Sequence, residues 1–295
     1  MTRLQFCEVM EIKSVELNMR VMDAMGLTGT AKTTLKVIED GQYLAPSGQM
    51  VTVRAQTERA LTGTILYRPD EVAALPFPRK EGRARVEVTA ETTGAAARRL
   101  CEEGERVVLL NFASARNPGG GFLRGAKAQE EDLARCSALY SSQITQPGYY
   151  EANRAQPSLL YTDHLIYSPD VPFFRDERLD FLEQPFFASV ITSPAPNAGQ
   201  VLARDASARP AIHEALVRRA RQVLTVAAKH EHRTLVLGAW GCGVFRNDPV
   251  EVAEVFAHAL DESGGVFARV VFAVWERSGD GPNLQAFRAR FTVAR

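Results

Sequence analysis

The chain has 295 residues, of which 45% are hydrophobic and 24% are charged, so it can bury one substantial core with a second small unit beside it. Lysine plus arginine and aspartate plus glutamate both total 35, which gives a net charge of zero. This balance argues against a protein that binds nucleic acid through bulk attraction to phosphate, and we expect no sequence-specific nucleic-acid binding. No apolar run is long enough to span a membrane, so no membrane partner is expected.

The cysteines indicate a cytoplasmic protein. There are four, Cys7, Cys101, Cys136 and Cys242, and none of them forms a Cys-x-x-Cys pair. Widely spaced cysteines of this kind are typical of reduced thiols in the cytoplasm. Charged residues among the first thirty also interrupt any signal-peptide core.

The first eighty residues predict a helical accessory segment packed on the core. Residues 8–40 mix apolar and charged side chains in a helical pattern, with a second helix through 31–39. The chain turns at Asp40-Gly41, and residues 43–55 have the pattern of a hairpin. We therefore expect two parts, an accessory segment over 1–80 and a catalytic domain over 81–295.

From residue 84 onward strands and helices alternate. Strand periodicity predicts a strand near 85–91, and apolar runs predict strands near 106–113, 165–167, 186–192, 234–240 and 268–275. Helices are expected at 94–101, at 208–230 and after Asp248-Pro249, ending at Gly264-Gly265. Strands of this kind are buried on both faces, so the pattern predicts a three-layer α/β domain with helices on both faces of the sheet.

Two glycine-rich loops each leave a predicted strand and precede a helix. One carries Gly119-Gly120-Gly121 and the other runs from Gly238 to Asn247. Ligands on α/β sheets lie outside the carboxyl ends of strands, so the backbone amides of both loops predict a diphosphate site. Neither loop matches the dinucleotide-binding fingerprint or the P-loop, which disfavours a dehydrogenase and a P-loop nucleotidase.

Glu130 and Glu131 are expected in the first turn of a helix that also carries Leu133, Cys136, Leu139 and Tyr140. A solvated acidic helix start is the alternative interpretation of this pair. Neighbouring helical residues diverge by about 100°, so the two carboxylates cannot do the same job. If the pair acts on a glycosidic bond, a single glutamate would serve first as the acid and then as the base.

The remaining reactive side chains predict neither a nucleophile nor a metal site. Cys242 lies between two glycines with no histidine in its loop, which is typical of a small residue in a tight turn. His230 and His232 lack carboxylate or cysteine neighbours at metal-ligand spacing.

The central motif resembles that of the bacterial type of poly(ADP-ribose) glycohydrolase, a catalytic branch of the macrodomain fold. Its signature is Gly-Gly-Gly, six to eight residues, then Gln-Glu-Glu, and here seven residues separate Gly121 from Gln129-Glu130-Glu131. The segments 111–118, 167–175, 192–197 and 237–247 are also similar, so the resemblance covers roughly residues 25 to 290. It implies a macrodomain-like fold with a mixed sheet and an N-terminal helical extension, and no metal or redox cofactor.

The resemblance also implies roles for individual residues. Glu131 would be the catalytic acid and base, Glu130 would hold ribose hydroxyls and Gln129 would support the loop. The remaining binding residues would hold the distal ribose or wrap the diphosphate: Asn117, Gly119, Gly120, Gly121, Gly241, Cys242, Gly243, Val244 and Phe245.

The implied activity is hydrolysis of poly(ADP-ribose) from its chain ends, with ADP-ribose as the product. Two other functions would use a similar pocket. One is removal of single ADP-ribose units from modified protein or nucleic acid, and the other is non-catalytic binding of ADP-ribose. Two retained acids beside an intact triple glycine disfavour a pure binding module, because binding needs no proton donor.

Overall fold

A computed structural model describes residues 26–292. The expected helical pattern before residue 26 lies outside this range. The helices are α2 (Leu27–Asp40), α3 (Arg54–Gly63), α4 (Pro69–Ala73), α5 (Thr93–Glu102), α6 (Gln129–Cys136), α7 (Leu139–Ile144), α8 (Pro147–Ala155), α9 (Ala198–Arg204), α10 (Arg209–Lys229), α11 (Pro249–Ser263) and α12 (Pro282–Phe291), with short 3₁₀ turns η1 (Phe122–Arg124) and η2 (Ala206–Ala208).

The strands form two sheets. They are β1 (Gln42–Leu44), β2 (Met50–Thr52), β3 (Ile65–Tyr67), β4 (Arg85–Thr89), β5 (Val107–Phe112), β6 (Leu165–Arg175), β7 (Phe181–Ser193), β8 (Thr234–Leu237) and β9 (Arg269–Ala273). The first two pair as the hairpin expected at 43–55, and the others make a seven-stranded sheet in the order β3-β6-β7-β5-β8-β9-β4. This sheet is mixed, because β3, β6 and β7 pair antiparallel whereas β5 is parallel to both β7 and β8.

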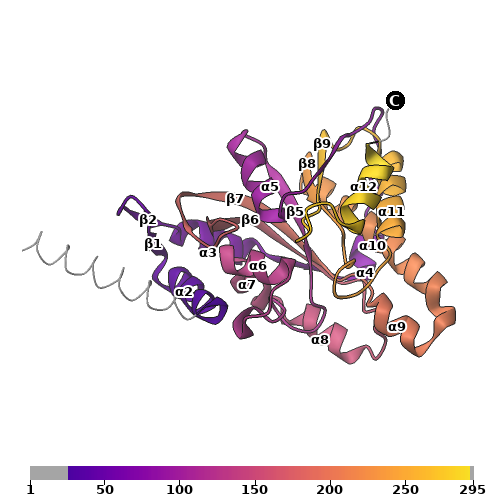
Figure 1. Ribbon diagram of the computed structural model, residues 1–295, viewed down its shortest axis with the longest axis horizontal. Helices are drawn as coiled ribbons and strands as arrows, with labels where there is room; N and C mark the ends of the chain where they lie inside the picture. Colours follow the sequence, from indigo (N-terminus) through magenta and orange to yellow (C-terminus); the bar gives the residue numbers. More distant parts are fainter. Residues whose placement is uncertain (1–25, 293–295) are drawn as a thin grey trace, which may run out of the picture.

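Helices cover both faces of the large sheet, as predicted (Figure 1). Along β5, Val108 and Leu110 pack into the core beneath α10 and α11, whereas Val107 and Leu109 pack into the core beneath α5 and α6. This alternation is the two-residue period of a strand buried on both faces. The three-layer α/β architecture is therefore confirmed.

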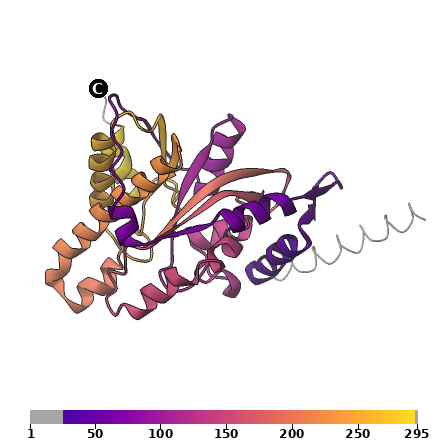
Figure 2. The ribbon, with the colours of Figure 1, turned by 180° about the vertical axis from the view of Figure 1, so that it is seen from behind.

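The N-terminal part contributes to the large sheet as well as covering it. Strand β3 is an edge strand of the sheet and pairs with β6. Helix α3 packs along β6, on the face that Figure 2 turns toward the viewer. The division into parts at residue 80 stays a prediction, and β3 lies on the accessory side of that boundary.

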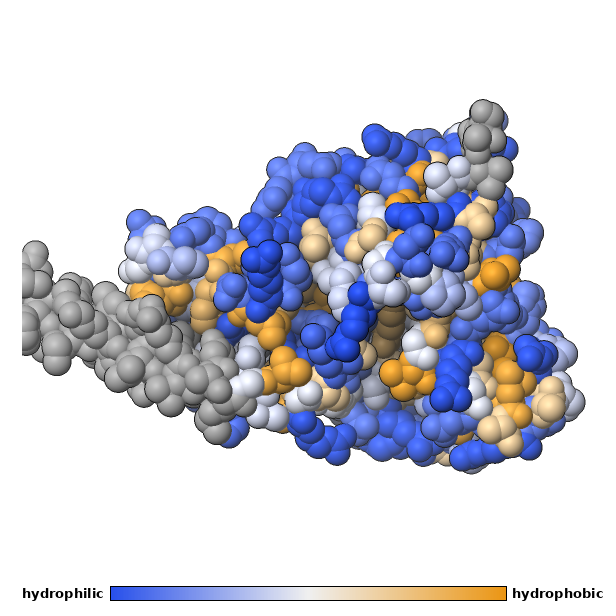
Figure 3. Space-filling view, in the orientation of Figure 1, coloured by the Kyte–Doolittle hydropathy of each residue, from blue (hydrophilic) through white to orange (hydrophobic). Residues whose placement is uncertain are grey.

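The surface is mostly hydrophilic in the orientation of Figure 1, with apolar patches scattered between charged side chains (Figure 3). Within residues 26–292, no helix has both the length and the apolar character that crossing a membrane requires.

The start of α11 was predicted from Asp248-Pro249, and the structure shows the expected helix cap. The Asp248 carboxylate accepts a hydrogen bond of 2.9 Å from the Val250 N–H, with Pro249 at the first helical position. We expect Asp248→Ala to lower the free energy of unfolding by about 1 kcal/mol, because that N–H loses its acceptor. Urea denaturation measures the change. Asp248→Asn keeps a capping oxygen and is the control, so equal losses in both variants would contradict this account.

Candidate active site

Strands β5 and β8 are parallel neighbours, so their carboxyl ends meet at one edge of the sheet. The first glycine loop leaves β5 and leads through η1 to α6, and the second leaves β8 and leads to α11. The topology therefore brings together two segments that are about 120 residues apart in the sequence, at the kind of edge where α/β proteins bind ligands.

Gln129 fastens the start of α6 to the end of β5. Its side-chain oxygen accepts a hydrogen bond of 2.8 Å from the Phe112 N–H, and its Nε2 donates to the Leu110 carbonyl at 2.8 Å. Strand β8 pairs with β5 only as far as Leu109, so these backbone groups have no strand partner on that side. The side-chain amide of Gln129 replaces the missing strand.

Glu130 is 3% exposed and points toward the sheet. Its Oε1 accepts hydrogen bonds from the Asn111 side chain at 3.0 Å and the Gln143 side chain at 2.8 Å, and its Oε2 accepts from the Ser114 N–H at 2.6 Å. Burial raises the pKa of Glu130 to about 7; these three donors oppose the rise and the charge of Glu131 adds to it.

Glu131 is 8% exposed and turns toward the first glycine loop. Its Oε1 accepts a hydrogen bond of 2.8 Å from the Gly121 N–H. Its Oε2 makes no hydrogen bond with any group in residues 26–292. The two carboxylates thus have separate partners, as helical geometry predicts, and one carboxyl oxygen of Glu131 remains available to a ligand.

The triple-glycine positions require glycine for two reasons: neighbouring side chains lie too close for a Cβ, and Gly119 and Gly120 have positive φ. Gly120 has φ +57°, and a Cβ there would lie 2.4 Å from Glu131 Oε1 and 3.1 Å from Glu130 Oε2. A Cβ at Gly119 would lie 2.9 Å from the Tyr140 ring, and one at Gly121 would lie 2.5 Å from Ala126. Side chains at these positions would displace the carboxylates or the loop that holds them.

The expectation that both loops offer their amides to a diphosphate is wrong for the first loop. The N–H groups of Gly119, Gly120 and Gly121 donate to Gln143 Oε1, the Asn117 carbonyl and Glu131 Oε1. These amides are used to shape the loop and to orient Glu131. The signal that identifies a glycine loop does not reveal whether its amides already have acceptors.

The second loop leaves its amides free. In the described part of the chain, the N–H groups of Gly241, Gly243, Val244 and Phe245 make no hydrogen bond. Asn247 closes the loop instead, because its Nδ2 donates to the Pro196 and Gly241 carbonyls at 2.9 and 3.1 Å. The N–H groups at 243–245 are therefore three consecutive unpaired donors, the kind of backbone group that can accept an anion.

Cys242 is not suited to nucleophilic attack. Burial raises the pKa of its thiol well above the ordinary range, so the side chain remains neutral at physiological pH. Its N–H donates to the Ala239 carbonyl at 3.1 Å, so it does not add to the free amides of the loop. Of the expected binding residues, it is the one whose backbone amide is already paired in this loop.

A cavity of about 340 Å³ opens at this edge of the sheet. Gln129 and Gly243 line it, whereas Glu130 and Glu131 are not among its lining residues. It continues along the carboxyl ends of the strands past Phe112 and Ala273 to Trp275, whose side chain is 55% exposed. Within residues 26–292, no cluster of His, Cys, Asp and Glu is arranged to hold a metal ion.

Comparisons with known proteins identify the family of the chain. A family model described as the catalytic domain of microbial-type PARG matches residues 31–176. The crystal structure of poly(ADP-ribose) glycohydrolase from Thermomonospora curvata is 48% identical, with a TM-score of 0.86, and the match covers 90% of this chain and 100% of that one. The chain belongs to the microbial-type poly(ADP-ribose) glycohydrolase family.

Further members of the family were solved with ligands. The Thermomonospora curvata protein with the inhibitor ADP-HPD is 48% identical, with a TM-score of 0.85 over 90% of this chain and 100% of that one. The Deinococcus radiodurans protein with ADP-ribose is 47% identical, with a TM-score of 0.75 over 80% of this chain and 96% of that one. No curated protein sequence matches the chain.

Several supporting residues of this family member were not identified from the sequence. Asn111 and Gln143 hold Glu130, and Trp275 lines the cavity. Asn111 carried a usable signal, because it is a polar residue inside the apolar run of β5. Gln143 carried none, since it lies on α7, a separate helix from the single longer one expected after Glu131. The break follows Cys136, where Ser137 forms an isolated bridge with Phe173 of β6.

Gly120 tests the close approach of the loop to the carboxylates. We expect Gly120→Ala to lower the free energy of unfolding by about 2 kcal/mol or more, from the positive φ together with the contact with Glu131. Gly104→Ala is the matched control, because Gly104 has φ +89° but a Cβ there meets nothing within 4 Å. Urea denaturation measures both losses, and a Gly120→Ala loss no larger than that of Gly104→Ala would contradict the prediction.

The raised pKa of Glu130 predicts a pH-dependent stability. Between its ordinary value of 4.5 and about 7, the folded protein keeps a proton that the unfolded chain has released. The free energy of unfolding should therefore fall as pH rises through this window, by up to about 3 kcal/mol. Glu130→Gln cannot titrate and should lose this part of the slope in denaturation curves recorded from pH 4 to 8. An identical slope in the two proteins would show that another group causes it.

Proposed function

We propose that the protein hydrolyses the ribose–ribose O-glycosidic bond of poly(ADP-ribose) and releases ADP-ribose, with Glu131 as the catalytic residue. The observation that carries this proposal is the placement of Glu131 against the triple-glycine loop, with Oε1 held by the Gly121 N–H and Oε2 free. Its membership of the microbial-type poly(ADP-ribose) glycohydrolase family supports the choice of substrate.

The proposed reaction uses one carboxyl group twice. Protonated Glu131 gives its proton to the leaving ribose oxygen as the glycosidic bond breaks through an oxocarbenium-like transition state. The resulting carboxylate then takes a proton from the attacking water, whose oxygen forms the new bond to the anomeric carbon. A single residue must do both because Glu130, the neighbouring acid, points toward Asn111 and Gln143 instead.

Glu130 is proposed to hold the distal ribose. Its Oε1 already accepts two hydrogen bonds and its Oε2 accepts one, so Oε2 retains one acceptor position for a ribose hydroxyl. Asn117 and the triple-glycine loop would enclose the same sugar. Gln129 would keep this arrangement in place through β5.

The diphosphate is proposed to bind the free amides of the second loop. Gly243, Val244 and Phe245 present consecutive N–H groups, with Gly241 and Cys242 shaping the turn and Phe245 beside the ribose. The exposed Trp275 at the far end of the cavity is our candidate for stacking on the adenine ring. Action at chain ends and a cytoplasmic location belong to the same proposal, the latter because Cys101, Cys136 and Cys242 are free thiols.

The test compares two substrates and two variants. With poly(ADP-ribose), the wild-type protein should release ADP-ribose, and Glu131→Gln should lower kcat by about 10³-fold with ADP-ribose affinity kept within several-fold. Chromatography measures product release, and calorimetry measures affinity. Asp132→Asn is the matched control, because Asp132 occupies the same first turn but pairs with Arg135.

Each alternative function has its own outcome. Release of ADP-ribose only from mono-ADP-ribosylated protein would favour removal of single units, and binding without turnover of either substrate would favour a non-catalytic module. Wild-type activity in Glu131→Gln would overturn the assignment of the catalytic residue. Products longer than one ADP-ribose unit at early times would contradict action at chain ends.

A further inference from the structure

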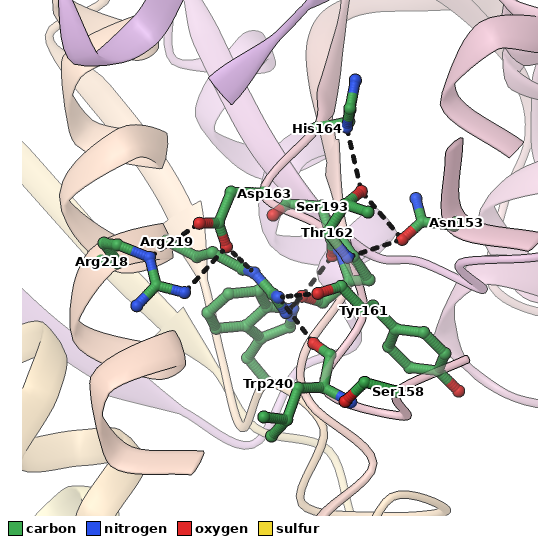
Figure 4. Close-up of polar contacts among 12 residues, drawn as sticks. Asn153, Ser158, Tyr161, Thr162, Asp163, His164, Ser193, Arg218, Arg219 and Trp240 are labelled. Atoms are coloured by element: carbon green, nitrogen blue, oxygen red, sulfur yellow. Dashed lines mark hydrogen bonds and ion pairs between the residues drawn. The ribbon is translucent and has the colours of Figure 1, made fainter. Parts of the chain in front are cut away.

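The loop over residues 156–164, between α8 and β6, is fastened by one buried arginine of α10. Arg219 is 1% exposed, and all of its described hydrogen bonds go to the loop or to the segment after β7 (Figure 4). They run to Asp163 Oδ1 at 2.7 Å, the Leu160 carbonyl at 2.6 Å, the Tyr161 carbonyl at 3.0 Å and the Pro194 carbonyl at 2.9 Å.

A buried charge pair of this kind is weak evidence for stability, because desolvation offsets most of its attraction. Its distinctive effect is geometric, since the planar guanidinium fixes several acceptors at once. Arg218 provides a contrast, because it also pairs with Asp163 but is largely exposed and reaches none of the loop carbonyls (Figure 4). The structure thus places two adjacent arginines on one carboxylate, and of these two only Arg219 also donates to carbonyls of the loop.

Tyr161 is held in a strained conformation within this loop. Its φ of +62° lies in the left-handed region, which a non-glycine residue adopts only when its surroundings impose it. Arg219 donates a hydrogen bond to the Tyr161 carbonyl. The Tyr161 ring lies 5.9 Å from the Phe245 ring, centroid to centroid, at a tilt of 43°. The strained backbone therefore directs an aromatic ring onto the second glycine loop.

The end of β7 and the residues after it contact both loops. The Trp240 indole donates to the Ser193 carbonyl at 3.1 Å, and Asn247 donates to the Pro196 carbonyl at 2.9 Å. Arg219 reaches Pro194 between them. The second glycine loop and the 156–164 loop therefore share one support, with the Tyr161–Phe245 contact between them.

We propose that Arg219 and Tyr161 are positioning residues that set the place of the Phe245 ring at the ribose end of the site. Arg219 fixes the backbone at Leu160 and Tyr161, and the Tyr161 ring then limits how far Phe245 can move away from the sugar. This inference rests on the proposed function, in which Phe245 packs beside the distal ribose. Neither residue contacts substrate in this account, and both act through Phe245.

Tyr161→Asn removes the ring but keeps a residue that tolerates the left-handed conformation, so the fold should be retained. We normalise kcat for poly(ADP-ribose) to the number of sites that bind ADP-ribose. On this scale kcat should fall about tenfold with KM within threefold, because the diphosphate contacts remain while the ribose is misplaced. Amide hydrogen exchange at residues 241–247 should rise. Tyr161→Phe keeps the ring and should restore both measurements.

Arg219→Lys should reproduce the kinetic and exchange changes, because one ammonium cannot reach all four acceptors. Arg218→Met is the matched control and should leave kcat within twofold. The proposal is overturned if Tyr161→Asn leaves kcat per site and exchange at 241–247 unchanged, or if Arg218→Met causes the same loss as Arg219→Lys.

Failure of the proposed function would be distinguishable from failure of this inference. A wild-type protein that does not hydrolyse the polymer would overturn the function, while hydrogen exchange at 241–247 would still decide whether Arg219 and Tyr161 order the loop. If Arg219→Lys does not fold, the pair Tyr161→Asn and Tyr161→Phe decides the question.

Discussion

The start of α6 is tied to the end of β5 by two adjacent side chains, and the candidate site depends on this connection. Gln129 pairs with the backbone that β8 leaves uncovered, and Glu130 accepts hydrogen bonds from Asn111 and the Ser114 N–H. Because both side chains are committed to the sheet, the direction of the third residue follows. Glu131 must then turn toward the glycine loop, where the Gly121 N–H meets it.

This arrangement buries the carboxylate of Glu130. Burial disfavours the charged form and so raises the pKa of the group. Three donors offset part of that rise, and the pKa of Glu130 settles near 7. At neutral pH the ionised form of such a group can accept a hydrogen bond from a hydroxyl. The same hydrogen bonds that support Glu130 also tie together β5 and α7, so local electrostatics and packing cannot be changed separately.

Helix α2 supports the first glycine loop, and the end of β7 supports the second. Helix α2 packs against η1 and α6, and the core there contains Ala31, Phe122 and Ala134. On the other side, the carbonyls of Ser193, Pro194 and Pro196 accept hydrogen bonds from Trp240, Arg219 and Asn247. The carboxyl end of β7 and the residues that follow it therefore support the second glycine loop and the 156–164 loop together.

Much of the architecture was predictable because its signals are local. Apolar runs marked the strands of the large sheet, and Asp248-Pro249 marked the start of α11. The short edge strand β3 was missed, since three residues carry no periodicity. The amides of the triple glycine were misjudged, because whether an N–H is free depends on Gln143 and Glu131 folding back onto it.

The sequence by itself determined the layers of the fold, the two glycine loops and the divergence of Glu130 and Glu131, because periodicity, turn chemistry and helical geometry act over a few residues. Only the tertiary structure decided which loop keeps its amides free, which groups hold Glu130 and how Arg219 reaches the 156–164 loop. These depend on side-chain contacts between residues 10 to 59 positions apart, and no local pattern encodes which donor meets which acceptor.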